Sequence, residues 1–216
     1  MDCRDLAKLV SASKEKRGEL NKAAEISFIG LAAYFEAFCK NQFAAVINIC
    51  PQTLETFTSK RDNVTLELKD ILKIYTRLGG RLGSLLSEKY DFGSSRMINS
   101  LFTDLLGVTP FSTKESRAYE EFLNDRNLLV HHGGIYTFKY HGQRLANKPI
   151  SDFVNWNSLV IGKEQFRQSS DFLHSIVDKM ASSSHLALVD FMKANKIRLV
   201  KRKKEALQYL LWQYSE

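Results

Sequence analysis

The sequence predicts an all-α protein of four to five helices packed as a bundle, with a small β-hairpin inserted in its second half. Three observations lead to this prediction. Only three prolines, Pro51, Pro110 and Pro149, occur in 216 residues, so long stretches lack the residue that breaks helices. Apolar residues recur every three or four positions along these stretches. Each predicted helix has one apolar stripe, and a bundle buries such stripes most simply.

The first half of the chain is predicted to contain four helices. A charged helix covers residues 4–20, and a longer, more apolar helix covers residues 21–49 and ends at Pro51. A third helix is expected within residues 65–80, because a double glycine follows its last apolar residues. A fourth is expected within residues 94–110, where a serine can cap the start and a glycine and a proline follow the end.

The second half is predicted to mix helices with one hairpin. A helix over residues 112–132 begins at an S-x-x-E capping pattern and ends at two glycines. The aromatic alternation of residues 135–140 then predicts a short strand, with residues 155–161 as its partner. A long helix over residues 163–196 follows, and the serine triplet 182–184 is the place where it would break.

Composition indicates one folded domain with an anionic partner. Hydrophobic residues make up 44% of the chain and charged residues 25%, which is ordinary for a folded protein. We expect a single domain over residues 1–216, with a core at about 20–180 and a basic helical extension at 196–216. The net charge is +7 and the pI is about 9.2, which favours nucleic acid as the partner.

Cysteine use and hydropathy indicate the compartment. The chain has three cysteines, Cys3, Cys39 and Cys50, an odd number without metal-ligand spacing. We therefore expect neither a disulfide framework nor a metal site. We also expect no cofactor. The apolar stretch at residues 26–39 is too short and too charged to span a bilayer. The N-terminus has no apolar core of a secretory signal. We therefore expect a cytoplasmic protein without a membrane segment.

The end of the helix over residues 112–132 is the candidate catalytic site. In "NDRNLLVHHGG" an arginine, an asparagine and two histidines surround three apolar residues. Asn127 and His131 are four apart and share a helix face, and the long side chain of Arg126 can reach the same side. A guanidinium neutralises phosphate charge, and an imidazole exchanges protons near neutral pH. The alternative stays open that these are solvated residues, since cations favour a helix C-terminus.

This stretch resembles the R-x4-H signature of HEPN domains (higher eukaryotes and prokaryotes nucleotide-binding). In that signature an arginine is followed by a polar residue, three mostly apolar residues and a histidine, as in "RNLLVH". The early apolar helix, with Phe35, Glu36, Ala37 and Phe38 at its centre, looks like the long early helix of HEPN ribonuclease-like proteins. The order of elements is also similar, and the resemblance covers about residues 20–180.

The resemblance implies an activity and residue roles. Many HEPN proteins are metal-independent endoribonucleases of toxin–antitoxin and antiviral systems. Arg126 would bind phosphate and stabilise the transition state, Asn127 would assist, and His131 would act as general acid or base. The 2′-OH of RNA would attack the adjacent phosphate and leave a 2′,3′-cyclic phosphate. The alternative is a non-catalytic HEPN-like module that binds RNA or protein in a defence or regulatory complex.

The resemblance also implies partners. The family commonly dimerises through the motif helix, so a homodimer is expected, with Leu128, Leu129 and Val130 helping to bury the interface. An antitoxin or another defence-system protein would be a further partner. Some HEPN toxins have a tyrosine two residues after the histidine, which a nucleotidyltransferase modifies. Gly133 stands there in this chain, so an antitoxin of that kind is not expected.

Two residues are secondary candidates for the catalytic site. His132 could replace His131, although His131 is favoured because it shares the face of Asn127. Glu36 could reach the site, and the competing interpretation is a buried or rim carboxylate paired with a cation. His174 stands alone in a helical pattern and is interpreted as a packed or surface histidine.

A dense run of cations near the C-terminus is the candidate RNA-binding segment. Its members are Lys196, Arg198, Lys201, Arg202, Lys203 and Lys204. On one continuous helix, Arg198, Lys201 and Arg202 would share a face. Such a run would hold RNA through its phosphates. The competing interpretation is a solvated terminal helix whose leucines pack on the bundle.

Overall fold

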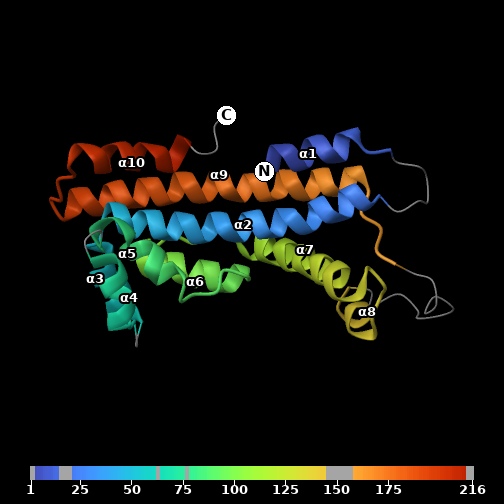
Figure 1. Cartoon of the computed structure of the whole chain (residues 1–216), viewed down its shortest axis with the longest axis horizontal. Helices are drawn as coiled ribbons and strands as arrows, with labels where there is room; N and C mark the ends of the chain where they lie inside the picture. The colour runs from blue at the N-terminus through green and yellow to red at the C-terminus, as the bar shows by residue number, and fades with distance from the viewer. Residues whose placement is uncertain (1–2, 15–20, 62–63, 76–77, 145–157, 213–216) are drawn as a thin grey trace. The chain divides into compact units, whose positions relative to one another are not determined.

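The protein is predominantly helical in the part that the computed structural model describes. The described residues are 3–14, 21–61, 64–75, 78–144 and 158–212. Their helices are α1 (Cys3–Ala12), α2 (Lys22–Ile49), α3 (Thr53–Lys60), α4 (Leu68–Ile74), α5 (Leu78–Ser87), α6 (Ser95–Leu106), α7 (Thr113–His132), α8 (Phe138–Arg144), α9 (Lys163–Ala194) and α10 (Lys201–Trp212) (Figure 1). The predicted all-α class is confirmed, whereas the HEPN arrangement stays a prediction.

The chain forms two compact units. Unit 1 comprises residues 1–35 and 113–174, and unit 2 comprises residues 36–112 and 175–216. Helices α2 and α9 each contribute residues to both units. The candidate catalytic residues on α7 therefore belong to unit 1, and the basic run belongs to unit 2.

Unit 1 holds α7 in place through an aromatic core. The rings of Phe28 on α2 and Phe122 on α7 lie 4.7 Å apart, and those of Phe35 and Tyr119 lie 5.2 Å apart. All four side chains are buried, and aromatic pairs at this spacing are favourable beyond their area. These contacts fix the face that α7 turns inward, and so the face that it leaves to solvent.

Unit 2 has its own aromatic core, centred on Phe43 of α2. Its ring makes edge contacts with Phe57, Phe92 and Phe102 at 5.5, 5.7 and 6.0 Å. All four rings are fully buried or nearly so. In the same unit α10 is folded back beside α9 (Figure 1), and its Leu210 is only 5% exposed.

Several predicted boundaries are confirmed by local chemistry. Helix α2 matches the helix predicted over residues 21–49, and α7 matches the one over 112–132. The side chain of Ser94 accepts a hydrogen bond from the backbone of Met97, and Gly107 ends α6 in the left-handed conformation with φ +71°. Serine caps and left-handed glycines are common helix boundaries, which is why α6 was predictable.

Three predicted helix boundaries are wrong. The first helix ends at Ala12 rather than at residue 20, and residues 15–20 lie outside the described part. Gly80 lies inside α5 and does not end a helix; among the described glycines only Gly107, Gly133 and Gly134 have the positive φ of such an end. Helix α9 runs unbroken through residues 182–184.

The serine triplet does not break α9, although the buried hydroxyl of Ser184 has no hydrogen-bond partner among the described residues. Ser183 donates to the carbonyl of Met180 one turn earlier, and Ser182 is exposed to solvent. The surrounding apolar residues Ala181 and Leu188 are buried. Tertiary packing of this face outweighs the weak helix preference of serine.

The predicted β-hairpin is replaced by a single bridge and a helix. Ile135 pairs with Ser158 in one antiparallel bridge, and α8 begins only three residues later; residues 155–157 lie outside the described part. The hydroxyl of Thr137 accepts a hydrogen bond from the backbone of Tyr140 and so caps α8. The rings of Tyr136 and Tyr140, four residues apart, stack at 5.2 Å. The aromatic residues that suggested a strand therefore lie at helical spacing, because residues four apart are neighbours on a helix.

Candidate functional site

The helix α7 ends in a closed turn that fixes the candidate catalytic residues. Gly133 and Gly134 have φ of +57° and +84°. The backbone N–H of Gly134 donates to the carbonyl of Leu128, six residues earlier, at 3.1 Å and so closes the end of the helix. The carbonyl of Gly134 then accepts from the N–H of Leu159 at 2.8 Å. The two glycines thus attach the end of α7 to the segment that leads into α9.

The three apolar residues of the motif do not share one face. Leu128 and Leu129 are buried, at 2% and 8% exposure, whereas Val130 is 44% exposed. His131 and His132 are both exposed. The two leucines are already packed within the chain, so they are not available to bury a dimer interface as expected from the sequence. Only Val130 of the three presents a surface to a partner.

The arginine and the asparagine of the motif are joined by a hydrogen bond. Nη1 of Arg126 donates to Oδ1 of Asn127 at 2.8 Å. Arg126 is half-buried while Asn127 is exposed, and the buried Nε of Arg126 has no hydrogen-bond partner among the described residues. The arginine stem is therefore packed and its tip is held by a neighbour, so the guanidinium is presented with reduced freedom.

A buried carboxylate beside the motif was missed by the sequence analysis. Asp125 is 3% exposed, and its Oδ1 accepts from the hydroxyl of Tyr140 at 2.7 Å. Its Oδ2 lies 3.5 Å from Nε2 of Gln165 on α9. Asp125 thereby connects α7 to α8 and to the start of α9. The sequence did contain a signal, because Asp125 lies on the stripe of Tyr119 and Phe122, where apolar residues are expected.

The secondary candidates are spread over the two units. Glu36 is exposed and belongs to unit 2, so of the buried or rim positions that the competing interpretation allowed, the buried one is excluded. His185 in unit 2 is half-buried, and burial lowers the pKa of its imidazole. The histidines of the motif, His131 and His132, are in unit 1.

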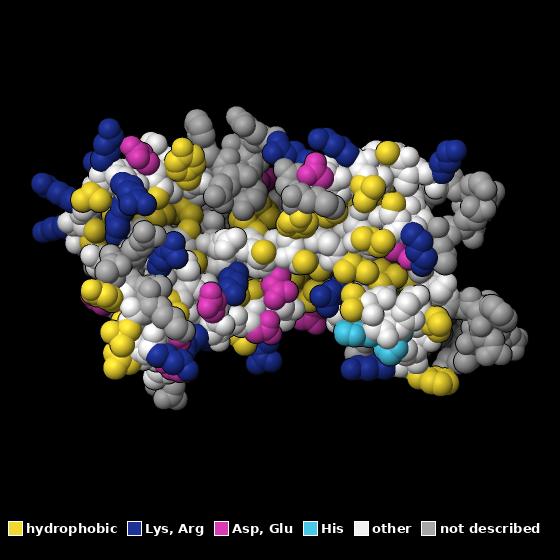
Figure 2. Space-filling model, in the orientation of Figure 1, with side chains coloured by type: hydrophobic (Ala, Val, Ile, Leu, Met, Phe, Trp, Pro, Cys, Tyr) yellow, Lys and Arg dark blue, Asp and Glu magenta, His cyan; other side chains and the backbone are white. Residues whose placement is uncertain are grey.

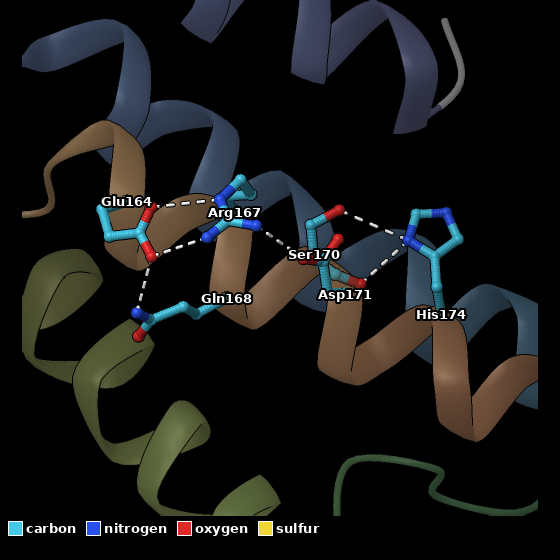
Figure 3. Close-up of polar contacts among 6 residues, drawn as sticks. All are labelled: Glu164, Arg167, Gln168, Ser170, Asp171 and His174. Atoms are coloured by element: carbon cyan, nitrogen blue, oxygen red, sulfur yellow. Dashed lines mark hydrogen bonds and ion pairs between the residues drawn. The ribbon is translucent and has the colours of Figure 1, made fainter.

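His174 belongs to a polar surface network on α9, as expected of a surface histidine. Its Nδ1 lies 2.8 Å from the carbonyl of Ser170 (Figure 3). Earlier on the same helix Arg167 bonds Glu164 at 2.8 Å and Asp171 at 3.4 Å. The hydrogen bond from Arg167 is the main reason why the pKa of Glu164 is lowered. The charged side chains of Glu164, Arg167 and Asp171 are paired with one another and exposed to solvent. Such pairs contribute little to stability. We therefore assign no catalytic role to these side chains.

The basic run is only partly helical. Lys196 ends α9 in the left-handed conformation, with φ +54°, and the backbone of residues 197–200 is not helical. Helix α10 begins at Lys201. The prediction that Arg198 shares a helix face with Lys201 is therefore wrong. Figure 2 shows lysine and arginine side chains gathered where Figure 1 places the turn from α9 to α10.

Within the described residues, no group of three or more histidine, cysteine, aspartate or glutamate side chains is arranged to hold a metal ion. The free cysteines Cys39 and Cys50 are buried, and burial raises the pKa of both thiols. No described helix is long and apolar enough to cross a membrane. Comparison with protein-family models, with curated proteins and with solved structures gives no match.

Proposed function

We propose that the protein is a metal-independent endoribonuclease of the HEPN type, acting as a toxin or an antiviral defence effector. The observation that carries the proposal is the hydrogen bond from Arg126 to Asn127 at the exposed end of α7, next to the exposed His131. Asn127 and His131 are solvent-exposed, and Arg126 is half-buried. A guanidinium, an amide and an imidazole at one helix end suit transfer at a phosphodiester.

Each residue has one role in the proposed reaction. His131 accepts the proton of the 2′-OH, and the 2′-oxygen attacks the adjacent phosphorus. The bond from phosphorus to the 5′-oxygen breaks, and that oxygen leaves with a proton returned by an imidazolium. Arg126 forks onto the non-bridging phosphate oxygens and offsets the charge that grows on them. Asn127 holds Arg126 in the orientation for this contact.

The two proton transfers of the proposed reaction favour an active site formed by two copies of the chain. One proton is removed and another is delivered in the same reaction, and two imidazoles perform this more readily than one. We propose a symmetric homodimer through the C-terminal end of α7. Besides Val130, the neighbouring Ile135 and Phe138 are 62% and 75% exposed. These exposed apolar side chains, close together in the sequence, are the ones that such a dimer would bury.

Alanine substitutions test the proposed catalytic residues. Arg126→Ala and His131→Ala should each abolish cleavage of single-stranded RNA. His131 is exposed, and Arg126 is half-buried with an Nε that has no hydrogen-bond partner among the described residues, so the melting temperature should change little. His132→Ala is the matched control, because it removes an equally exposed imidazole from the next position and should leave cleavage intact. Cleavage at the wild-type rate by both Arg126→Ala and His131→Ala would refute the assignment. RNA binding without any cleavage by the wild type would instead favour a non-catalytic module.

A further inference from the structure

Helix α10 in unit 2 has two distinct faces. Leu210 is 5% exposed, and Lys203, Ala206 and Leu207 are half-buried; together they form the inward stripe. The outward face carries Arg202, Glu205 and Tyr209, all of which are exposed. Arg202 and Tyr209 are seven residues apart, which is two helical turns, so their side chains lie above one another on the same face.

The start of α10 carries positive charge where a helix least favours it. Residues 201–204 are four consecutive cations, and the first turn contains no acidic residue. The N-terminal end of a helix carries partial positive charge, so cations there are repelled by the helix dipole and by one another. Glu205 is the one acidic residue among the described residues of α10. A polyanion bound at this face would relieve the repulsion.

Tyr209 indicates what kind of polyanion fits. Its side chain is 59% exposed, although a tyrosine on an amphipathic helix could have been placed on the packed side. An exposed ring beside cations offers stacking to an unpaired base while the cations contact phosphates. A membrane surface fits less well, because binding there requires a free apolar face, and Leu210 on that face is buried within the protein.

We propose that the outward face of α10, formed by Lys201, Arg202 and Tyr209, is a docking surface for single-stranded RNA. Lys201 and Arg202 contact phosphates, and Tyr209 stacks on a base. Arg202 and Tyr209 lie about 10 Å apart along the helix axis. The choice of RNA rests on the proposed function, whereas the preference for a single strand rests on Tyr209. Lys203 is assigned to the inward face and takes no direct part.

Binding to an uncleavable ligand tests this surface separately from catalysis. The probe is a fluorescent oligouridine of about 12 nucleotides with 2′-O-methyl groups, which cannot be cut by 2′-OH attack. The double variant Lys201→Gln/Arg202→Gln should bind more weakly and lower the salt slope by about 1.4, since each single-strand phosphate contact contributes about 0.7. Tyr209→Ala should bind about tenfold more weakly with an unchanged slope, and Tyr209→Phe should bind as the wild type does.

Two further substitutions separate a specific surface from net charge. Glu205→Gln should tighten binding, because it removes the negative charge beside Arg202 and Tyr209. Lys203→Gln should reduce the salt slope less than Arg202→Gln does, although both remove one charge from the same turn. The control Lys8→Gln/Lys69→Gln removes two charges that are exposed elsewhere and should leave affinity and slope nearly unchanged.

The proposal is overturned if the Lys201→Gln/Arg202→Gln variant keeps the wild-type affinity and slope. It is equally overturned if Tyr209→Ala binds as tightly as the wild type, or if a duplex of the same length competes as well as the single strand. Binding to vesicles rich in phosphatidylserine in preference to the oligonucleotide would also overturn it. Failure of the proposed nuclease has a different signature: no cleavage that depends on Arg126, while the α10 variants still change oligonucleotide binding.

Discussion

The bond between Tyr140 and Asp125 gives a stability prediction with a magnitude. Tyr140→Phe removes only the hydroxyl that donates to Oδ1 of Asp125 at 2.7 Å. Both side chains are buried, at 7% and 3% exposure, so water cannot replace the lost donor. Gln165 lies 3.5 Å from the other oxygen, at the limit of a hydrogen bond, and compensates little. A hydrogen bond to a charged group contributes about 1.5–3 kcal/mol.

We therefore expect Tyr140→Phe to lower the free energy of unfolding by about 2 kcal/mol. For a chain of this length this corresponds to a fall in melting temperature of about 4–8 °C. Urea titration and thermal melting followed by circular dichroism measure both quantities. Tyr209→Phe is the matched control: it removes the same hydroxyl from a ring that is 59% exposed, and should change stability by less than about 0.5 kcal/mol.

A double-mutant cycle identifies the cause of the loss. In an Asp125→Leu background the carboxylate is absent, so Tyr140→Phe should cost far less than in the wild type. An equal cost in both backgrounds would show that the hydroxyl of Tyr140 stabilises the protein by some other contact. That result would refute the interpretation of Asp125 as the residue that connects α7 to α8.

Two further predictions concern packing and assembly. Gly83→Ala should destabilise the protein by about 3 kcal/mol, because the added Cβ would lie 2.0 Å from the carbonyl oxygen of Ala44; Gly80→Ala on the same helix meets nothing within 4 Å and should stabilise by about 0.5–1 kcal/mol. Equal effects of the two substitutions in urea titrations would contradict this placement of α5 on α2. Phe138→Asp should convert the proposed dimer to a monomer in analytical ultracentrifugation, whereas Leu72→Asp, which is 61% exposed on α4, should not. A wild-type chain that is monomeric at micromolar concentration yet cleaves RNA would exclude the dimer.

The elements that the sequence predicts correctly are those with local signals. Helix α6 has its serine cap and its glycine end within the segment itself, and α7 ends at two glycines with positive φ. The all-α class follows from the apolar period over long proline-free stretches. These features depend on residues within a few positions of one another, so periodicity and capping chemistry suffice.

The missed features depend on residues far apart in the chain. Asp125 is buried because Tyr140 and Gln165, 15 and 40 residues later, provide donors; without them a carboxylate on the apolar stripe is unfavourable. Helix α8 stands where a strand was predicted, and its Tyr140 is held inward by that same bond. The left-handed Lys196 interrupts the basic run, and no local pattern predicts this conformation for a lysine.

The candidate site was partly accessible from the sequence. Spacing alone placed Arg126, Asn127 and His131 at one helix end, and an asparagine that orients the arginine was anticipated from its chemistry. Periodicity did not resolve which apolar residues of the motif face outward, because Leu128, Leu129 and Val130 are consecutive. The tertiary structure separates the buried leucines from the exposed valine.

The chemistry of the RNA product tests the central proposal most directly. Two oligonucleotides of the same sequence, one of RNA and one with 2′-O-methyl groups throughout, are incubated with the wild-type protein in excess EDTA, and the products are analysed by mass spectrometry. We expect only the RNA to be cut, with 2′,3′-cyclic phosphate ends, and no cutting by His131→Ala. Cleavage of the methylated strand, or activity that EDTA removes and a divalent metal restores, would contradict a metal-independent attack by the 2′-OH.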